Sequence, residues 1–257
     1  MLKIRVIPTL LWKGFGLVKG VGFNSWRRVG TVLPALKVYN TRDVDELVLV
    51  DITASQEQRA PDHEAVADFS DECYVPLTVG GGINDLQQIV VLLRAGADKI
   101  SINSAAFVNP ELVDQAAMRF GAQCVVVSID VRRHDDGACS VFSHSGTLDT
   151  RKDPCSWARE MASRGAGEIL LTSIDRDGTM QGYDLRLVEQ IAACVDIPVI
   201  ASGGAGNYQH MVEVIQQAGA SAVAAASMFH FTEQTPAGAK QALHLAGIPV
   251  RQNFVAV

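Results

Sequence analysis

Short apolar runs rich in β-branched residues recur along the chain, and segments with helical periodicity separate most of them. In one such segment Leu86, Ile89, Val90 and Leu93 fall on one face of a helix. We expect strands at residues 4–8, 46–51, 76–79, 99–103, 124–130, 168–174, 198–202 and 221–226. Strands that alternate with helices form parallel sheets, and eight such units need about 250 residues. The 257 residues therefore favour an α/β fold, the closed (β/α)8 or TIM barrel, and an open doubly wound sheet is the alternative.

The chain also repeats itself at a spacing of 122 or 123 residues. The matched pairs are residues 76–82 with 198–204, residues 95–97 with 218–220, and Glu46 with Glu168. Because this spacing is half of the predicted barrel, it indicates an internal repeat of two half-barrels that carry related sites.

We expect one barrel domain over residues 1–251 and a C-terminal tail over residues 252–257. Two long segments interrupt the strand and helix pattern, at residues 11–32 and 131–154, and the second is predicted to hold a small hairpin at residues 139–144. Loops at the carboxyl ends of barrel strands build the active site, so both segments are candidate lids.

The composition narrows the possible partners and compartments. A net charge of −6 argues against nucleic acid, because nucleic-acid binders usually carry a basic face. The five cysteines are an odd number without a C-x-x-C pair, which predicts neither a disulfide framework nor a zinc site. We expect no metal, no cofactor and no membrane span, and a cytoplasmic protein, since the first residues lack the features of a signal peptide.

Glycines and small polar residues follow four of the predicted strands, in two pairs half a barrel apart. The first corner comprises Gly81, Gly82, Asn103 and Ser104, and the second comprises Gly203, Gly204, Ala226 and Ser227, flanked by Asp177 and Gly178. Small residues let backbone N–H groups approach a phosphate, although glycines also serve ordinary tight turns. Two equivalent corners predict a phosphorylated small molecule with a phosphate at each end.

Polar side chains end several strands and could act on such a ligand. Asp130 ends the fifth strand on the same face as Ser128, so it is a candidate general acid or base at the barrel mouth. A helix N-cap or a loop salt bridge is the alternative role. Further candidates for substrate binding are Asp51, Asn103, Thr172 and Ser202.

Six long motifs resemble the cyclase subunit of imidazole glycerol phosphate synthase, over residues 1–251. They are residues 44–55, 76–83, 96–106, 165–179, 182–184 and 197–206. The related isomerase of histidine synthesis is less similar at residues 45–55 and 174–179. The resemblance implies a barrel that receives ammonia from a glutaminase subunit bound at its N-terminal end. At the other end, the family closes an imidazole ring from a bis-phosphorylated ribulosyl substrate and releases an aminoimidazole carboxamide ribotide.

The resemblance fails at one position that matters for this chemistry. The family uses two aspartates, and Asp130 matches the one on the fifth strand, whereas Leu11 stands in place of the one on the first strand. Leucine cannot transfer a proton, and the loss of a positioned acid or base typically costs about 10²–10⁴ in rate. Gly14 and Gly16 also depart from the family pattern. Lys19 keeps its place and could bind a phosphate or cover the site, or it could be an ordinary surface lysine.

Four charges open predicted strands at the other end of the barrel: Arg5, Glu46, Lys99 and Glu168. Inward charges at this position are costly unless they pair, and two cations can pair with two anions in a closed ring. In the family such a ring guards the way in for ammonia, and the alternative is a purely structural plug. Above the ring we expect a mostly apolar bore, lined by Val48, Ser101, Val126, Leu170 and Ile200.

Some bacteria carry a second copy of this two-protein system within gene sets for surface polysaccharides. This chain is similar to that group at residues 10–11, Leu-Leu, and at residues 16–19, Gly-Leu-Val-Lys. The similarity implies that the barrel and its glutaminase supply ammonia to a separate sugar amidotransferase, which makes an acetamidino group in O-antigen synthesis. The alternatives are a histidine-pathway cyclase (a lyase) that tolerates Leu11 and a non-catalytic activator of the glutaminase.

Overall fold

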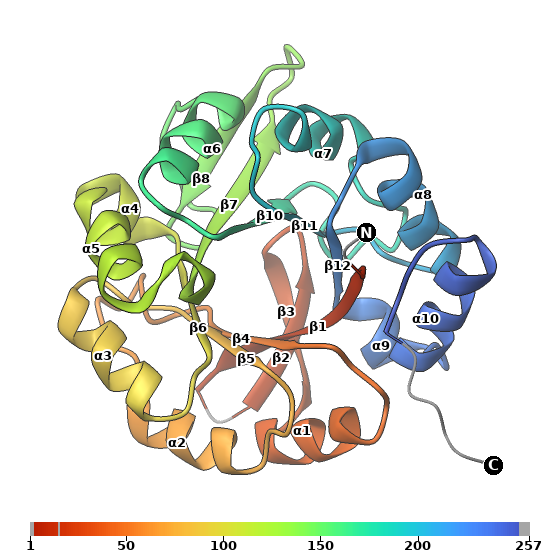
Figure 1. The fold of residues 1–257 in the computed structure, drawn as a ribbon, viewed down its shortest axis with the longest axis horizontal. Helices are drawn as coiled ribbons and strands as arrows, with labels where there is room; N and C mark the ends of the chain where they lie inside the picture. The colour runs from red at the N-terminus through yellow and green to blue at the C-terminus, as the bar shows by residue number, and fades with distance from the viewer. Residues whose placement is uncertain (1–2, 15, 252–257) are drawn as a thin grey trace.

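The computed structural model describes residues 3–14 and 16–251, and its strands form a closed barrel with helices outside (Figure 1). The barrel strands are β1 (Arg5–Lys13), β4 (Leu47–Asp51), β5 (Leu77–Gly80), β6 (Lys99–Ile102), β7 (Val125–Arg133), β10 (Glu168–Ser173), β11 (Val199–Ser202) and β12 (Ala222–Ala225). Neighbouring barrel strands pair in parallel, and the pairings of β1 with β12 and of β7 with β10 complete the ring. The predicted (β/α)8 barrel is confirmed, and the open sheet is wrong.

Helices cover the outside of the ring, as Figure 1 shows. They are α1 (Val32–Asn40), α2 (His63–Asp71), α3 (Leu86–Arg94), α4 (Ser104–Val108), α5 (Glu111–Phe120), α6 (Pro154–Ser163), α7 (Leu185–Ala192), α8 (Tyr208–Ala218), α9 (Ser227–Phe231) and α10 (Pro236–Leu245), with the short 3-10 helix η1 (Ala122–Cys124) before β7. Several begin at an Asp or Asn that caps a free amide. In α3, for example, the Asp85 carboxylate accepts from Gln88 N, and Ile89 and Leu92 are buried.

The alternation of side chains along each strand divides the apolar core in two. Outward residues of the strands pack against the helices in one large cluster. Inward residues form a second, smaller cluster inside the ring, made of Ile7, Val48, Val126, Leu170, Ile200, Ala222 and Ala224. Four of the five predicted bore residues lie in this inner cluster, while Ser101 lies above it at the cavity.

The two long segments expected to be loops are antiparallel strands. β1 and β7 run further than predicted, beyond the point where their parallel neighbours end. Their exposed backbone groups there need new partners, which β2 (Gly16–Val21) and β8 (Cys139–Ser143) supply. β2 then pairs with β3 (Asn24–Gly30), and β8 with β9 (Leu148–Asp149). The hairpin expected at residues 139–144 is therefore larger, with its turn after Ser143.

Other expectations concern the whole chain. None of the helices in the described part has the length and apolar character needed to cross a membrane. All five cysteines are free thiols. The predicted tail at residues 252–257 lies outside the described residues.

Candidate functional site

A single cavity at the carboxyl ends of the barrel strands brings together every residue that the sequence predicted for ligand binding or catalysis. These residues are Leu11, Lys19, Asp51, Gly81, Gly82, Asn103, Ser104, Asp130, Thr172, Asp177, Gly178, Ser202, Gly203, Gly204, Ala226 and Ser227. They come from both half-barrels, since β1, β4, β5 and β6 supply one wall and β7, β10, β11 and β12 supply the other.

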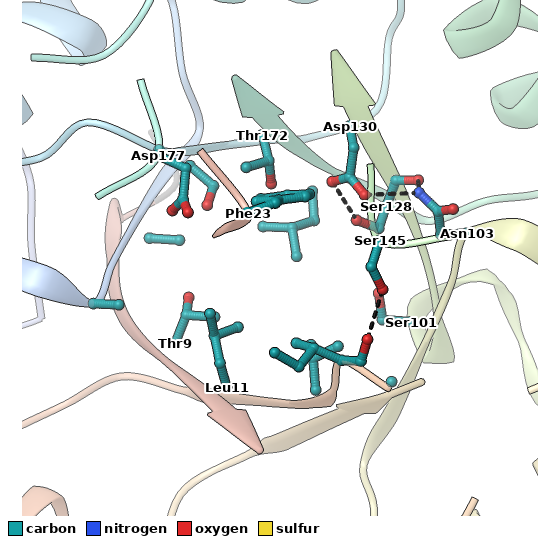
Figure 2. A pocket seen from close by; sticks show the side chains of 18 of the residues that line it. Thr9, Leu11, Phe23, Ser101, Asn103, Ser128, Asp130, Ser145, Thr172 and Asp177 are labelled. Carbon is teal, nitrogen blue, oxygen red and sulfur yellow. Dashed lines mark hydrogen bonds between the residues drawn. The ribbon is translucent and has the colours of Figure 1, made fainter. Parts of the chain in front are cut away.

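The cavity also includes residues that the sequence did not indicate. Phe23, Trp26 and Ser145 line it from the two antiparallel hairpins, and Thr9 and Ser55 line it from the barrel and its loops. Phe23 and Ser145 both lie in turns with left-handed backbone, at φ 62° and 55°. Their contribution could not be predicted because the hairpins that carry them were expected to be loops. Figure 2 shows Phe23 and Ser145 projecting into the cavity.

The two glycine corners have closely similar backbone geometry. Gly81 and Gly203 adopt φ of 104° and 88°, values that only glycine adopts easily. A Cβ atom at Gly81 would lie 2.2 Å from the carbonyl oxygen of Asp51, and one at Gly203 would lie 2.6 Å from that of Ser173. The space and the backbone therefore both require glycine at these two positions of the cavity lining.

Asp130 is a buried carboxylate with several polar neighbours. Asn103 Nδ2 donates to its Oδ2 at 3.0 Å, and Ser128 Oγ donates to its Oδ1 at 3.4 Å. Burial raises the pKa of Asp130, and the negative charge of Asp177 raises it further, while the hydroxyls of Ser128 and Thr172 act in the opposite direction. The result is a pKa of about 7, which suits a group that both accepts and donates protons near neutral pH.

Leu11 and Thr9 occupy the opposite side of the cavity from Asp130 and Ser128, as Figure 2 shows. Leu11 is held in place by its pairing with Val18 on β2 and Val50 on β4. The buried Thr9 hydroxyl has no hydrogen-bond partner among the described residues. On β7 the Ser128 hydroxyl bonds the carboxylate of the residue two positions later, whereas on β1 the residue two positions after Thr9 is Leu11, which offers no acceptor.

Lys19 is buried, with 2% of its surface exposed, so it is not a surface lysine. Its ammonium lies 2.8 Å from both carboxylate oxygens of Asp177. A backbone bond from Gly22 N to Asp177 O, at 2.9 Å, lies beside this ion pair. The β2–β3 hairpin is thereby fastened to the loop that follows β10, across the second corner.

Asp51 lines the cavity, but its carboxylate is already engaged by the loop that follows β4. Its Oδ1 accepts from the N–H groups of Thr53 and Ala54, and its Oδ2 lies 3.0 Å from the Arg59 guanidinium. This arrangement fits the predicted role of orienting neighbours and gives Asp51 no route to replace the missing partner of Asp130.

The four predicted charges form a closed ring at the N-terminal end of the barrel. Arg5 bonds Glu46 at 2.7 Å and Glu168 at 2.8 Å, and Lys99 bonds the same two carboxylates at 3.0 and 3.1 Å. Burial lowers the pKa of Arg5, but the two carboxylates outweigh it and the net shift is upward. The ring thus pairs two basic with two acidic side chains, as inward charges at the end of a barrel require.

The apolar inner cluster lies between this ring and the cavity, with Leu170 and Ala224 touching the cavity itself. Its members offer no hydrogen-bonding side chain. An ion placed there would lose its hydration without compensation.

No group of three or more metal-ligating side chains lies together within residues 3–14 and 16–251. The arrangement combines two glycine corners with the buried carboxylate of Asp130, whose pKa is raised. A comparison with models of protein families matches residues 5–235 to the family described as "Histidine biosynthesis protein".

Proposed function

Because this chain belongs to the histidine biosynthesis protein family, we propose that it is the barrel subunit of an ammonia-handling pair of proteins. A glutaminase subunit binds at the N-terminal end and releases ammonia there. The ammonia passes the ring of Arg5, Glu46, Lys99 and Glu168, crosses the apolar inner cluster and reaches the cavity. The cavity binds a phosphorylated small molecule at its glycine corners.

One observation carries the proposal: the charged ring is complete while Leu11 replaces the carboxylate opposite Asp130. Buried ion pairs contribute little net stability, so stability alone does not account for four paired charges at the N-terminal end of the barrel. A function at that end accounts for them. A chain that closes an imidazole ring by the family's chemistry would need a second acid or base. Ammonia supply without ring closure accounts for both features.

The acceptor of the ammonia is then a separate enzyme. The similarity of residues 10–11 and 16–19 to the second-copy group supports a sugar amidotransferase that makes an acetamidino group for a surface polysaccharide. Neutral ammonia would leave through the cavity, at the end of the barrel opposite the glutaminase.

The proposal is tested in a histidine auxotroph that lacks its own cyclase. The native chain, expressed with its glutaminase, should not restore growth, whereas an authentic cyclase pair should. Robust growth with the native chain would overturn the proposal.

The proposed passage of ammonia through the inner cluster is tested separately, with a variant that carries a larger side chain there. In Ala224→Leu, the added side chain narrows the inner cluster, so glutamine-dependent amidination should fall strongly while glutaminase activity in the same sample persists. Equal amidination in wild type and variant would show that ammonia takes another route.

A second candidate function, a working cyclase, is favoured by Asp130, whose pKa of about 7 suits acid–base catalysis between two phosphate corners. Turnover of the bis-phosphorylated ribulosyl substrate with an ammonium salt distinguishes it, because the salt bypasses the glutaminase. A third candidate, an activator without transport, predicts that Ala224→Leu changes nothing.

A further inference from the structure

The two glycine corners match in backbone geometry but differ in the state of their serine hydroxyls. Ser104 follows β6 and Ser227 follows β12, at the spacing of the internal repeat. The Ser104 hydroxyl accepts from His144 N at 2.9 Å and donates to Asn103 Oδ1 at 3.2 Å. The Ser227 hydroxyl is buried, in a residue only 5% exposed, and has no hydrogen-bond partner among the described residues.

A buried hydroxyl without a partner is unfavourable, and it lines the cavity beside Gly203 and Gly204. An anion at that position would accept its hydrogen bond and remove the penalty. At the other corner the single hydroxyl proton of Ser104 is already donated, so an anion there finds one donor fewer.

The difference comes from the turn that joins β8 to β9. Besides the His144 amide on Ser104, the turn bonds the barrel through Ser145 Oγ to Ile52 O at 2.6 Å and through Gln56 Nε2 to His144 O at 3.2 Å. These bonds hold the turn over the first corner, and Figure 2 shows Ser145 reaching into the cavity. The equivalent β2–β3 hairpin bonds Asp177 and leaves Ser227 untouched.

The turn is also strained. His144 and Ser145 adopt φ of 52° and 55°, in the left-handed region that side chains other than glycine rarely adopt. Such residues persist only where surrounding contacts hold them, and the three bonds to Ser104, Ile52 and Gln56 provide that hold. Loss of these bonds would remove what holds the two residues in this region.

We propose that the β8–β9 turn is a gate over the first corner, so that a ligand with two phosphates binds in order, first at Ser227 and then at Ser104 once the turn lifts. This inference rests on the proposed phosphate-binding function and adds the regulation of one of its two subsites. Ser145 is the residue that holds the gate, through its bond to Ile52.

Inorganic phosphate is the probe, and backbone amide NMR signals of Gly203–Gly204 and Gly81–Gly82 report the two corners separately. In the wild type the Gly203 and Gly204 signals should saturate at a phosphate concentration about tenfold or more below that for Gly81 and Gly82. Ser145→Ala loses the bond to Ile52, so binding at Gly81 and Gly82 should strengthen about three- to tenfold with no change at Gly203 and Gly204.

Thr150→Val is the matched control, because its hydroxyl donates to Val141 O and accepts from Lys152 N, and neither partner lines the cavity. It should leave both corners unchanged. Equal affinities at the two corners of the wild type, or weaker binding at Gly81 and Gly82 in Ser145→Ala, would overturn the gate and leave the proposed function standing. The absence of any phosphate response at either corner would instead remove the phosphate-binding function itself.

Discussion

The strand ends of β1 and β7 occupy equivalent places in the two half-barrels, yet they offer different chemistry. On β7, Ser128 and Asp130 form a hydrogen-bonded pair with a titratable carboxylate. On β1, the Thr9 hydroxyl has no hydrogen-bond partner in the described part of the chain, and Leu11 has an apolar side chain. The glycine turns of the two halves are more alike, since Gly81 and Gly203 both adopt positive φ. Equivalent positions of the two half-barrels therefore carry side chains of different chemistry, although both halves share one barrel backbone.

The charged ring also differs between the half-barrels, in which half supplies its basic residues. Glu46 and Glu168 are counterparts in the repeat, but the cations Arg5 and Lys99 both belong to the first half. Their counterparts are Cys124 and Ala222, which carry no charge. If both halves carried these two cations, the ring would hold four cations and only two carboxylates, so the departure from symmetry leaves two charges of each sign.

The largest effect is expected from a substitution that gives β1 the carboxylate that β7 has. Leu11→Asp places an acid two residues from the free Thr9 hydroxyl and opposite Asp130, so ring-closing turnover with an ammonium salt should rise about 10²-fold or more. The control is Leu11→Asn, which has the same size and no titrating group. If both variants give the same rate, the missing carboxylate does not limit the reaction.

The carboxylate of β7 should also make stability depend on pH. An unfolded aspartate ionises near pH 4, whereas the pKa of Asp130 is about 7, so the native state holds its proton longer. The stability from this group is complete below about pH 4 and is lost as the pH rises to about 7, by up to about 4 kcal/mol.

Asp130→Asn should therefore lose less stability than the wild type between pH 4 and pH 8, in urea unfolding at each pH. Leu11→Asn serves as the control, because it adds an amide at the opposite strand end and changes no titrating group. Identical pH slopes in wild type and Asp130→Asn would contradict the raised pKa.

The smallest expected effect is a change in the pKa of Asp130 when the neighbouring Asp177 loses its charge. Asp177→Asn removes the negative charge that acts on Asp130, so the pKa of Asp130 should move down from about 7, measured by carboxyl ¹³C NMR. Asp175→Asn is the control in the same loop, because its carboxylate bonds Arg133 N and lies away from the cavity lining. An equal shift in both variants would mean that Asp177 has no specific role.

Much of the barrel could be predicted from the sequence, because strand and helix periods differ and each barrel strand is short and apolar. The site residues that end barrel strands could be predicted for the same reason, since parallel strands bring their carboxyl ends to one edge. Phe23, Trp26 and Ser145 could not, because β2, β3, β8 and β9 arise from the overhang of β1 and β7. That overhang follows from tertiary pairing, which local periodicity does not report.

The burial and the hydrogen-bond partners of individual side chains could not be predicted from the sequence either. Lys19 stands in a glycine-rich stretch that was expected to be a loop, and its burial is explained by the ion pair with Asp177, which no local pattern reports. The hydroxyls of Thr9 and Ser227 have no hydrogen-bond partner among the described residues. That absence depends on the tertiary structure around each side chain, which a sequence pattern does not report.

The pairing of β1 with β12 joins residues more than 200 positions apart, such as Arg5 and Ala222. Long-range pairing of this kind costs loop-closure entropy before it returns any stabilisation, so we expect it to form late in folding. Arg5 lies on that same strand and supplies half of the cationic charge in the ring. A chain still on the ribosome therefore has an incomplete ring at this end of the barrel, and we expect the glutaminase partner proposed above to bind only after the last strand has been synthesised and docked.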